Sequence, residues 1–193
     1  MNPVTKVAVI CGSLRQQSYN GAVARTLPDI APAGMEFVFL DGLGDIPHFN
    51  ADLQTGAYPE RVQEWAEAIA EADAVVIVTP EYNFSVPGVL KNALDWLSRI
   101  QPGPFTRKPV AIQTASPGRM GGVRAQYHLR QIMVFLDADV LNKPEIIITD
   151  VAGKLGNDGL LADAPTRAIV AEQLAELQKL ARGTLHARKL EAV

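Results

Sequence analysis

The sequence has a single cysteine, three histidines and no long apolar run. Cys11 alone cannot form an intrachain disulfide, which excludes a disulfide-stabilised secreted fold and favours a reducing, cytoplasmic setting. His48, His128 and His186 have no metal-ligand spacing with one another or with Cys11, so we expect no metal site. No apolar run approaches the roughly 20 residues of a membrane helix, and the N-terminal stretch lacks the features of a signal peptide, so we expect no membrane insertion.

The chain also has no large excess of charge of one sign. The net charge is −3 and is spread without long runs, which argues against nucleic acid as a partner. Hydrophobic residues make up 48% of the chain and charged residues 20%, a globular composition that excludes intrinsic disorder. A chain of 193 residues without a linker or repeat predicts a single domain spanning residues 1–193.

Buried, β-branched runs alternate with amphipathic segments along the whole chain. This alternation predicts an α/β fold, a flavodoxin-like three-layer sandwich whose five-stranded parallel sheet has the order 2-1-3-4-5. The last strand is expected in two pieces, and Asn20 is expected to cap the first helix. The expected strands are 4–10, 35–40, 73–79, 110–115 and 139–141 with 145–149; the expected helices are 21–30, 60–72, 88–100, 123–136 and 165–185.

Ligands of such sheets bind at the carboxyl ends of the strands, where the strand order reverses. In the predicted order this point lies between the first and third strands. The loops that reach it are residues 12–20, 80–87 and 116–122, which are the segments richest in Gly, Pro, Ser, Asn and Tyr. A further loop, residues 41–59, is long and has no clear period, as functional surface loops often do.

The first of these loops has the residues of a phosphate site. Ser13 and Ser18 can donate hydroxyl hydrogen bonds, Arg15 can add a charge-assisted bond, and a helix N-terminus follows. The loop matches neither the Walker motif nor G-x-G-x-x-G. An ordinary strand-to-helix turn with Ser and Asn as caps is the alternative.

The second loop suits a planar heterocycle. Pro80 and Pro87 restrain its backbone, Tyr82 offers an aromatic surface, and Asn83 offers a donor and an acceptor. Phe84 offers a second aromatic surface, and the alternative for both Tyr82 and Phe84 is a place in the core or in a subunit interface.

The third loop has glycines that let the backbone approach a flat ligand closely. Gly118 is one of them. Arg119 beside it faces an anionic substrate or a pyridine-nucleotide phosphate, or is simply solvated.

Together the three loops resemble the NADPH-dependent FMN reductase family, with greatest similarity to its bacterial quinone and chromate reductases and to the related FMN azoreductases. The matching segments are GSLRQQSYN, TPEYNFSVPGVLKNALDWLSR and SPGRMGGVRAQYHLRQIMVFLDA, within residues 6–145. The resemblance implies bound FMN, with NADPH or NADH as electron donor. The cofactor-binding residues it implies are Ser13, Arg15, Ser18, Tyr19, Asn20, Pro80, Glu81, Tyr82, Asn83, Ser116 and Gly118.

The implied activity is electron transfer from NAD(P)H, by a ping-pong mechanism, to quinones and other small acceptors such as chromate, azo compounds or free flavin. FMN N5 would carry the chemistry, so no catalytic side chain is expected. Phe84 and Arg119 are the substrate-side candidates, because the chain departs from the family pattern at these two places. The alternative is a flavodoxin-like electron-transfer module that serves a protein partner.

The family's members are commonly dimers or tetramers with flavin sites near subunit contacts. A homodimer or homotetramer is therefore expected, with Arg124, Tyr127 and Glu145 as interface candidates. The loop of residues 41–59 could cover the flavin of a neighbouring subunit. The choice between NADH and NADPH, and the physiological acceptor, are left open by these residues.

Overall fold

The computed structural model describes residues 4–54 and 56–191. The ends of the predicted 1–193 domain and residue 55 of the predicted 41–59 loop lie outside the described residues. The elements are, in chain order, β1 (Thr5–Cys11), α1 (Tyr19–Ile30), β2 (Met35–Leu40), η1 (Leu43–Asp45), η2 (Ala51–Gln54), α2 (Glu60–Glu71), β3 (Ala74–Thr79), α3 (Gly88–Leu97), β4 (Pro109–Ala115), α4 (Val123–Phe135), β5 (Asp139–Val140), β6 (Ile146–Ile148), η3 (Val151–Lys154) and α5 (Ala164–Glu191).

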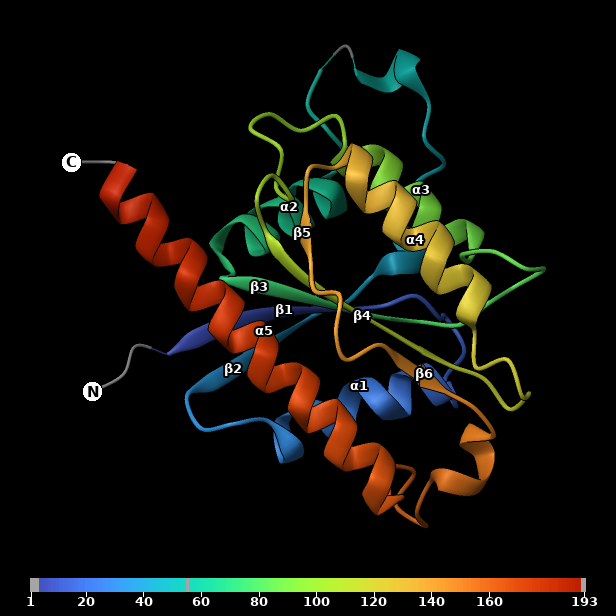
Figure 1. Ribbon diagram of the computed structural model, residues 1–193. Coiled ribbons are helices and arrows are strands. Elements are labelled where there is room, and N and C mark those ends of the chain that lie inside the picture. Colours follow the sequence, from blue (N-terminus) through green and yellow to red (C-terminus); the bar gives the residue numbers. More distant parts are fainter. Residues whose placement is uncertain (1–3, 55, 192–193) are drawn as a thin grey trace.

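The sheet is parallel throughout, with the order β2-β1-β3-β4-β5, which confirms the predicted flavodoxin-like α/β fold. Val9 of β1 lies opposite Phe39 of β2 and Val76 of β3. Every residue of β3 and β4 is buried, as expected for strands that helices cover on both faces. The carboxyl ends of β1, β3 and β4 lie toward the right in Figure 1.

The last strand is divided, as the sequence predicts. β5 pairs with the start of β4 and β6 with its end. In the gap between them, the side-chain amide of Gln173 from α5 donates to the carbonyls of Ile112 and Pro144 at 3.3 and 2.9 Å. From the other face, Gln126 donates to the carbonyl of Ile146 at 2.9 Å. Gln173 thus bridges β4 and the segment between β5 and β6, while Gln126 bonds to the first residue of β6.

The helices form two layers around the sheet. Figure 1 shows α1 and α5 across one face and α2, α3 and α4 grouped on the other. Side chains alternate along the strands, so that Ala8 and Ile10 pack against α2 and α3, whereas Val7 and Val9 pack toward α1 and α5. Both cores are apolar and nearly sealed from solvent.

One expected cap is wrong. The N-cap of α1 is Ser18, whose Oγ accepts the N–H of Gly21 at 3.1 Å. The helix therefore begins at Tyr19 instead of Gly21, and it continues two residues past Pro28. Asn20 lies inside the first turn, where its amide bonds to β4.

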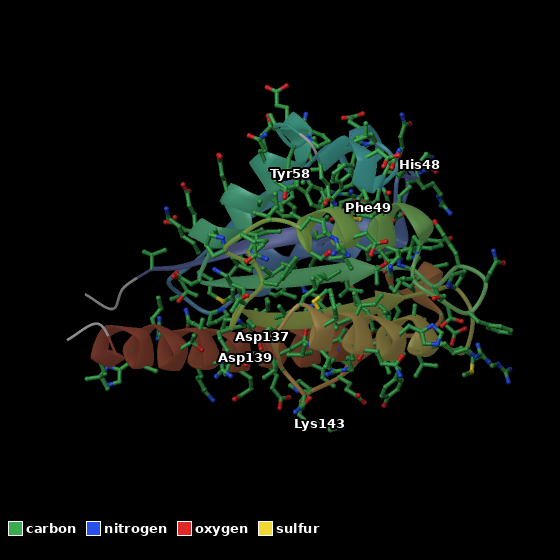
Figure 2. All side chains as sticks on the ribbon, turned by 90° about the horizontal axis from the view of Figure 1, so that it is seen from above. His48, Phe49, Tyr58, Asp137, Asp139 and Lys143 are labelled. Carbon is green, nitrogen blue, oxygen red and sulfur yellow. The ribbon has the colours of Figure 1, made fainter. Side chains whose placement is uncertain are left out.

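The predicted loop of residues 41–59 contains the two short 3-10 helices η1 and η2 and is anchored on α3. Asn92 accepts the N–H of Phe49 at 2.7 Å and donates to the carbonyl of Pro47 at 2.9 Å. The indole of Trp96 also donates to Pro47, at 2.8 Å, and its ring meets Phe49 edge-on at 5.1 Å between centroids. Figure 2 shows His48, Phe49 and Tyr58 on one flank of the molecule, and Asp137, Asp139 and Lys143 on the other.

None of the described helices combines the length and the apolar character needed to cross a membrane.

Candidate functional site

A cavity of about 130 Å³ lies where the loops after β1, β3 and β4 meet. This is the edge at which the strand order reverses, between β1 and β3. The residues that line it are Ser13, Arg15, Ser18, Tyr19, Asn20, Pro80, Glu81, Tyr82, Ala115, Ser116 and Pro117. All three predicted loops therefore contribute to one cavity.

The first wall is the turn between β1 and α1. Gly12 is required there, because a Cβ at this position would lie 2.3 Å from Thr79 Oγ1 of the neighbouring strand. The Ser18 oxygen caps Gly21, and the first intrahelical bond runs from Ala22 N–H to the Ser18 carbonyl. The N–H groups of Tyr19 and Asn20 precede that bond, so they have no intrahelical acceptor and can serve an anion.

Arg15 supplies the positive charge of the lining. Its guanidinium lies 5.1 Å from the centroid of the Tyr19 ring, which holds it beside the helix terminus by a cation–π contact. The side chain is otherwise exposed. An exposed guanidinium near unpaired N–H groups and serine hydroxyls is a donor set suited to a phosphate.

Asn20 ties the first wall to the third. Its Nδ2 donates to the Ala115 carbonyl at 3.0 Å, and its Oδ1 accepts the Ala115 N–H at 3.0 Å. The side chain is buried, and both polar atoms of its amide are bonded within the chain. Asn20 therefore lines the cavity, but its side-chain amide is used within the chain, where it fixes α1 against the end of β4.

The second wall is a tight hairpin. Tyr82 and Ser85 exchange two backbone hydrogen bonds of 3.0 Å, and the two residues between them, Asn83 and Phe84, have φ of 49° and 68°. Left-handed values at both central positions define a type I′ turn, which fixes the backbone direction strongly. Asparagine is favoured at the first of these positions, whereas phenylalanine is strained at the second, and such strain is common at functional sites.

Glu81 is the one carboxylate among the described residues of the lining. Its Oε1 forms an ion pair with Arg124 at 3.2 Å, on the side of α4. The negative charge is therefore balanced, and Arg15 leaves the lining with a cationic character.

The third wall follows β4. Ser116 Oγ accepts the Gly118 N–H at 3.1 Å and so closes a small turn. Gly122 begins α4 with φ of 88°, and a Cβ there would lie 2.8 Å from the Thr114 Cβ, so this position also requires glycine.

The structure does not bring every predicted residue into the lining. Asn83 and Gly118 belong to the wall-forming loops but do not line the cavity. The substrate-side candidates Phe84 and Arg119 are exposed in the same two loops, with 64% of the surface of Phe84 accessible.

The interface candidates find partners within the chain. Arg124 pairs with Glu81, and the Tyr127 hydroxyl lies 3.2 Å from Glu145 Oε1. Tyr127 is nevertheless half exposed on α4.

Sequence reasoning missed the lining roles of Ala115 and Pro117 and the contact between His128 Nδ1 and Ser85 Oγ, at 3.0 Å. Ala115 and Pro117 flank the predicted Ser116, so their position in the sequence could have indicated that they line the cavity. The contact between His128 and Ser85 joins residues that are 43 apart in the sequence, and no local sequence pattern predicts it.

Cys11 and His48 also lie outside the lining. Burial raises the pKa of the Cys11 thiol, which opposes the thiolate form that a reactive cysteine needs. His48 is exposed beside a separate cavity of about 380 Å³, between η1 and the start of α3.

A phosphorylated planar heterocycle fits this arrangement. The helix terminus, Ser13, Ser18 and Arg15 can hold a phosphate, while the restrained backbone of residues 80–82 and 115–117 can border a flat ring. The carboxylate of Glu81 does not oppose a phosphate there, because its charge is paired with Arg124.

The comparisons with known proteins agree with this chemistry. Residues 5–153 match the sequence model of a family described as NADPH-dependent FMN reductase. A quinone reductase of Escherichia coli is 58% identical over 148 residues, covering 76% of this chain and 79% of its own. An NAD(P)H-dependent FMN reductase of Pseudomonas aeruginosa is 45% identical over 92% of this chain and 96% of its own. The solved structure of FerB from Paracoccus denitrificans, a flavoenzyme NAD(P)H:(acceptor) oxidoreductase, superposes with a TM-score of 0.85 at 34% identity, covering 94% of this chain and 99% of that one.

Proposed function

The chain belongs to the NADPH-dependent FMN reductase family, and we propose that it binds FMN and carries electrons from NAD(P)H to quinones. The observation that carries the proposal is the cavity where the three loops meet. Its lining combines an exposed arginine, serine hydroxyls and a helix N-terminus beside a restrained turn. An ordinary strand-to-helix turn needs the serine cap but neither the exposed arginine nor the restrained turn opposite it.

The residues divide the binding of FMN between them. Ser13, Arg15 and Ser18, with the N-terminus of α1, would hold the phosphate. Pro80, Tyr82 and Ser116 would border the ring. When bound, FMN supplies a redox centre that accepts a hydride from NAD(P)H and passes electrons to an acceptor.

The chain itself orients the reactants. The carboxylate of Glu81 is paired with Arg124, so the described lining offers no free carboxylate to act as a general acid or base. In the second loop, Pro80 has no N–H and the Tyr82 N–H donates to the Ser85 carbonyl, so the Glu81 N–H is the lining donor that would stabilise negative charge on a bound ring.

The open side of the site sets the range of acceptors. Tyr82 and Phe84 are 50% and 64% exposed, and Arg119 is exposed in the third loop. Donor and acceptor would use this open side in turn, in a ping-pong sequence. Chromate, azo compounds and free flavin are proposed as further acceptors because an accessible redox centre selects weakly among small oxidants.

We propose a single cytoplasmic domain that assembles as a homodimer or homotetramer. The lone Cys11 suits a reducing compartment. On α4, Tyr127, Val134 and Phe135 are 50%, 78% and 74% exposed, which suits burial against a second subunit near Arg124 and Glu145.

The test is anaerobic spectroscopy of the purified protein. We expect a yellow flavin spectrum that NADPH or NADH bleaches, followed by reoxidation on addition of a quinone. A protein that shows no flavin spectrum after reconstitution with FMN would refute the proposal. Bleaching that requires a separate reductase would instead indicate an electron-transfer module for a protein partner.

A further inference from the structure

Glu81 lies in the cavity wall, yet its carboxylate serves another element. Its Oε2 accepts the backbone N–H groups of Arg124 and Ala125 at 2.9 and 3.2 Å, and its Oε1 accepts from the guanidinium of Arg124 at 3.2 Å. Only 12% of the side chain is exposed. Both oxygens are thus engaged by the first turn of α4, 43 residues further along the chain.

α4 has no cap of its own. Its N-cap position is Gly122, which has no side chain to accept a hydrogen bond. A larger residue there would meet Thr114 of β4 at 2.8 Å and would be strained at φ of 88°. The Val123 N–H donates to the Met120 carbonyl, but the next two N–H groups, of Arg124 and Ala125, need an acceptor from elsewhere. Glu81 provides a charged one that also suits the helix dipole.

The same helix holds the rest of the hairpin. The guanidinium of Arg124 lies 4.2 Å from the centroid of the Phe84 ring, and His128 Nδ1 lies 3.0 Å from Ser85 Oγ. Contacts from Glu81, Phe84 and Ser85 thus reach three positions on the first two turns of α4. The second loop is fixed to the helix that follows the third loop.

We infer that Glu81 is a positioning residue that sets the separation of the second and third walls of the site. The inference rests on the proposed binding of FMN in this cavity. The Glu81 carboxylate acts on FMN through α4 and the Tyr82–Ser85 hairpin, without contacting the cofactor itself. Glu81 thus has a different role from Arg15, which would bind the phosphate directly.

The experiment titrates apo-protein with FMN and follows the quenching of flavin fluorescence. We expect Glu81→Ala to weaken FMN binding roughly 3- to 30-fold, the range that corresponds to a lost helix cap. Glu81→Gln should lie between this variant and the wild type, because its amide oxygen can still accept the two N–H groups. Arg124→Gln should weaken binding about 2- to 5-fold although Arg124 is outside the lining. The double variant Glu81→Ala with Arg124→Gln should lose less affinity than the two single losses multiplied together, because both changes remove the same ion pair.

Two matched controls accompany the series. Glu64→Gln makes the same change in an exposed ion pair on α2, and Arg130→Gln removes an arginine from α4 farther from its first turn. Both should bind FMN within about 2-fold of the wild type. Unchanged FMN affinity in Glu81→Ala would show that Glu81 does not act through α4. Two single losses that combine in full in the double variant would show the same.

Hydrogen exchange of the apo-protein gives a readout that needs no cofactor. Glu81→Ala, which removes the acceptor, should speed exchange at the amides of Tyr82, Ser85, Arg124 and Ala125 together. Exchange that stays at the wild-type rate in the hairpin would contradict the inference even if affinity fell. A wild-type protein that binds no FMN would refute the proposed function alone, because the exchange rates still decide whether Glu81 holds the hairpin.

Discussion

Arg15 is the single cationic side chain among the described residues that line the cavity. Its guanidinium is exposed, makes no ion pair within the described part of the chain, and rests on the Tyr19 ring. This charge therefore adds little to the stability of the folded chain. Its contribution is to the binding of an anion. A residue of this kind can be removed without disturbing the structure around it.

Arg15→Ala should weaken FMN binding about 10-fold, which corresponds to about 1.4 kcal/mol, because one charge-assisted bond to the phosphate is lost. The melting temperature of the apo-protein should not change. Fluorescence titration and thermal unfolding measure the two quantities. Arg25→Ala, on the exposed side of α1, is the matched control. Equal FMN affinity in both variants would indicate that the first loop is an ordinary strand-to-helix turn and not a phosphate site.

At the scale of the elements, α1 and β4 are joined through the buried amide of Asn20. Asn20→Ala would leave the Ala115 N–H and carbonyl without these partners in a buried place. We expect a loss of about 2–4 kcal/mol in the free energy of unfolding, measured by urea denaturation of the apo-protein. Asn142→Ala, at an exposed position, should change it by less than about 0.5 kcal/mol. A similarly small change in Asn20→Ala would mean that the two bonds are replaced by water.

The attachment of the 41–59 loop to α3 can be tested in the same way. Asn92→Ala removes the acceptor for Phe49 and the donor for Pro47. The loop should then be cleaved several-fold faster by limited proteolysis, since local opening depends on these bonds. Lys91→Ala removes only a partly exposed pair with Asp95 on the next turn of the helix and should leave the cleavage rate unchanged. Equal rates in the two variants would locate the anchor in the Trp96 contacts instead.

Over the whole molecule, the cavity joins segments that folding brings together from three strands. A ligand there binds the folded chain and not the unfolded one, so it stabilises all of it. FMN at 100 times its dissociation constant should add about 2.7 kcal/mol, which raises the melting temperature by about 5–10 °C for a chain of this size. Adenosine monophosphate, which has a phosphate but no flavin ring, is the control ligand. The absence of any FMN-dependent shift would contradict binding to the folded state.

Much of this architecture is predictable from local pattern. The β-branched runs in β1, β3 and β4 match strands that are buried on both faces, and the divided last strand shows as two short apolar pieces. The rule that ligands bind where strand order reverses then brings the three loops to one edge. The cavity lining includes residues from all three.

What remained unpredictable depends on contacts between distant residues. Ser18 and Asn20 are both good capping residues, and the choice between them is made by Ala115, 95 residues away from Asn20. The orientation of Glu81 depends in the same way on Gly122, which leaves the start of α4 without a cap. Neither the capping residue nor the orientation of Glu81 can be predicted from local sequence. Each depends on which polar groups would otherwise be left unpaired in the folded chain.

The turn at Asn83 and Phe84 has a consequence for evolution and for engineering. Its backbone is set by two hydrogen bonds between Tyr82 and Ser85, and the exposed Phe84 ring makes no contribution to either core. Substitutions at position 84 therefore leave the packing of both cores intact and remove only the contact of its ring with the Arg124 guanidinium, while they change an exposed surface beside the cavity. A library confined to this one codon would test whether the proposed substrate-side position 84 influences which acceptors the protein uses.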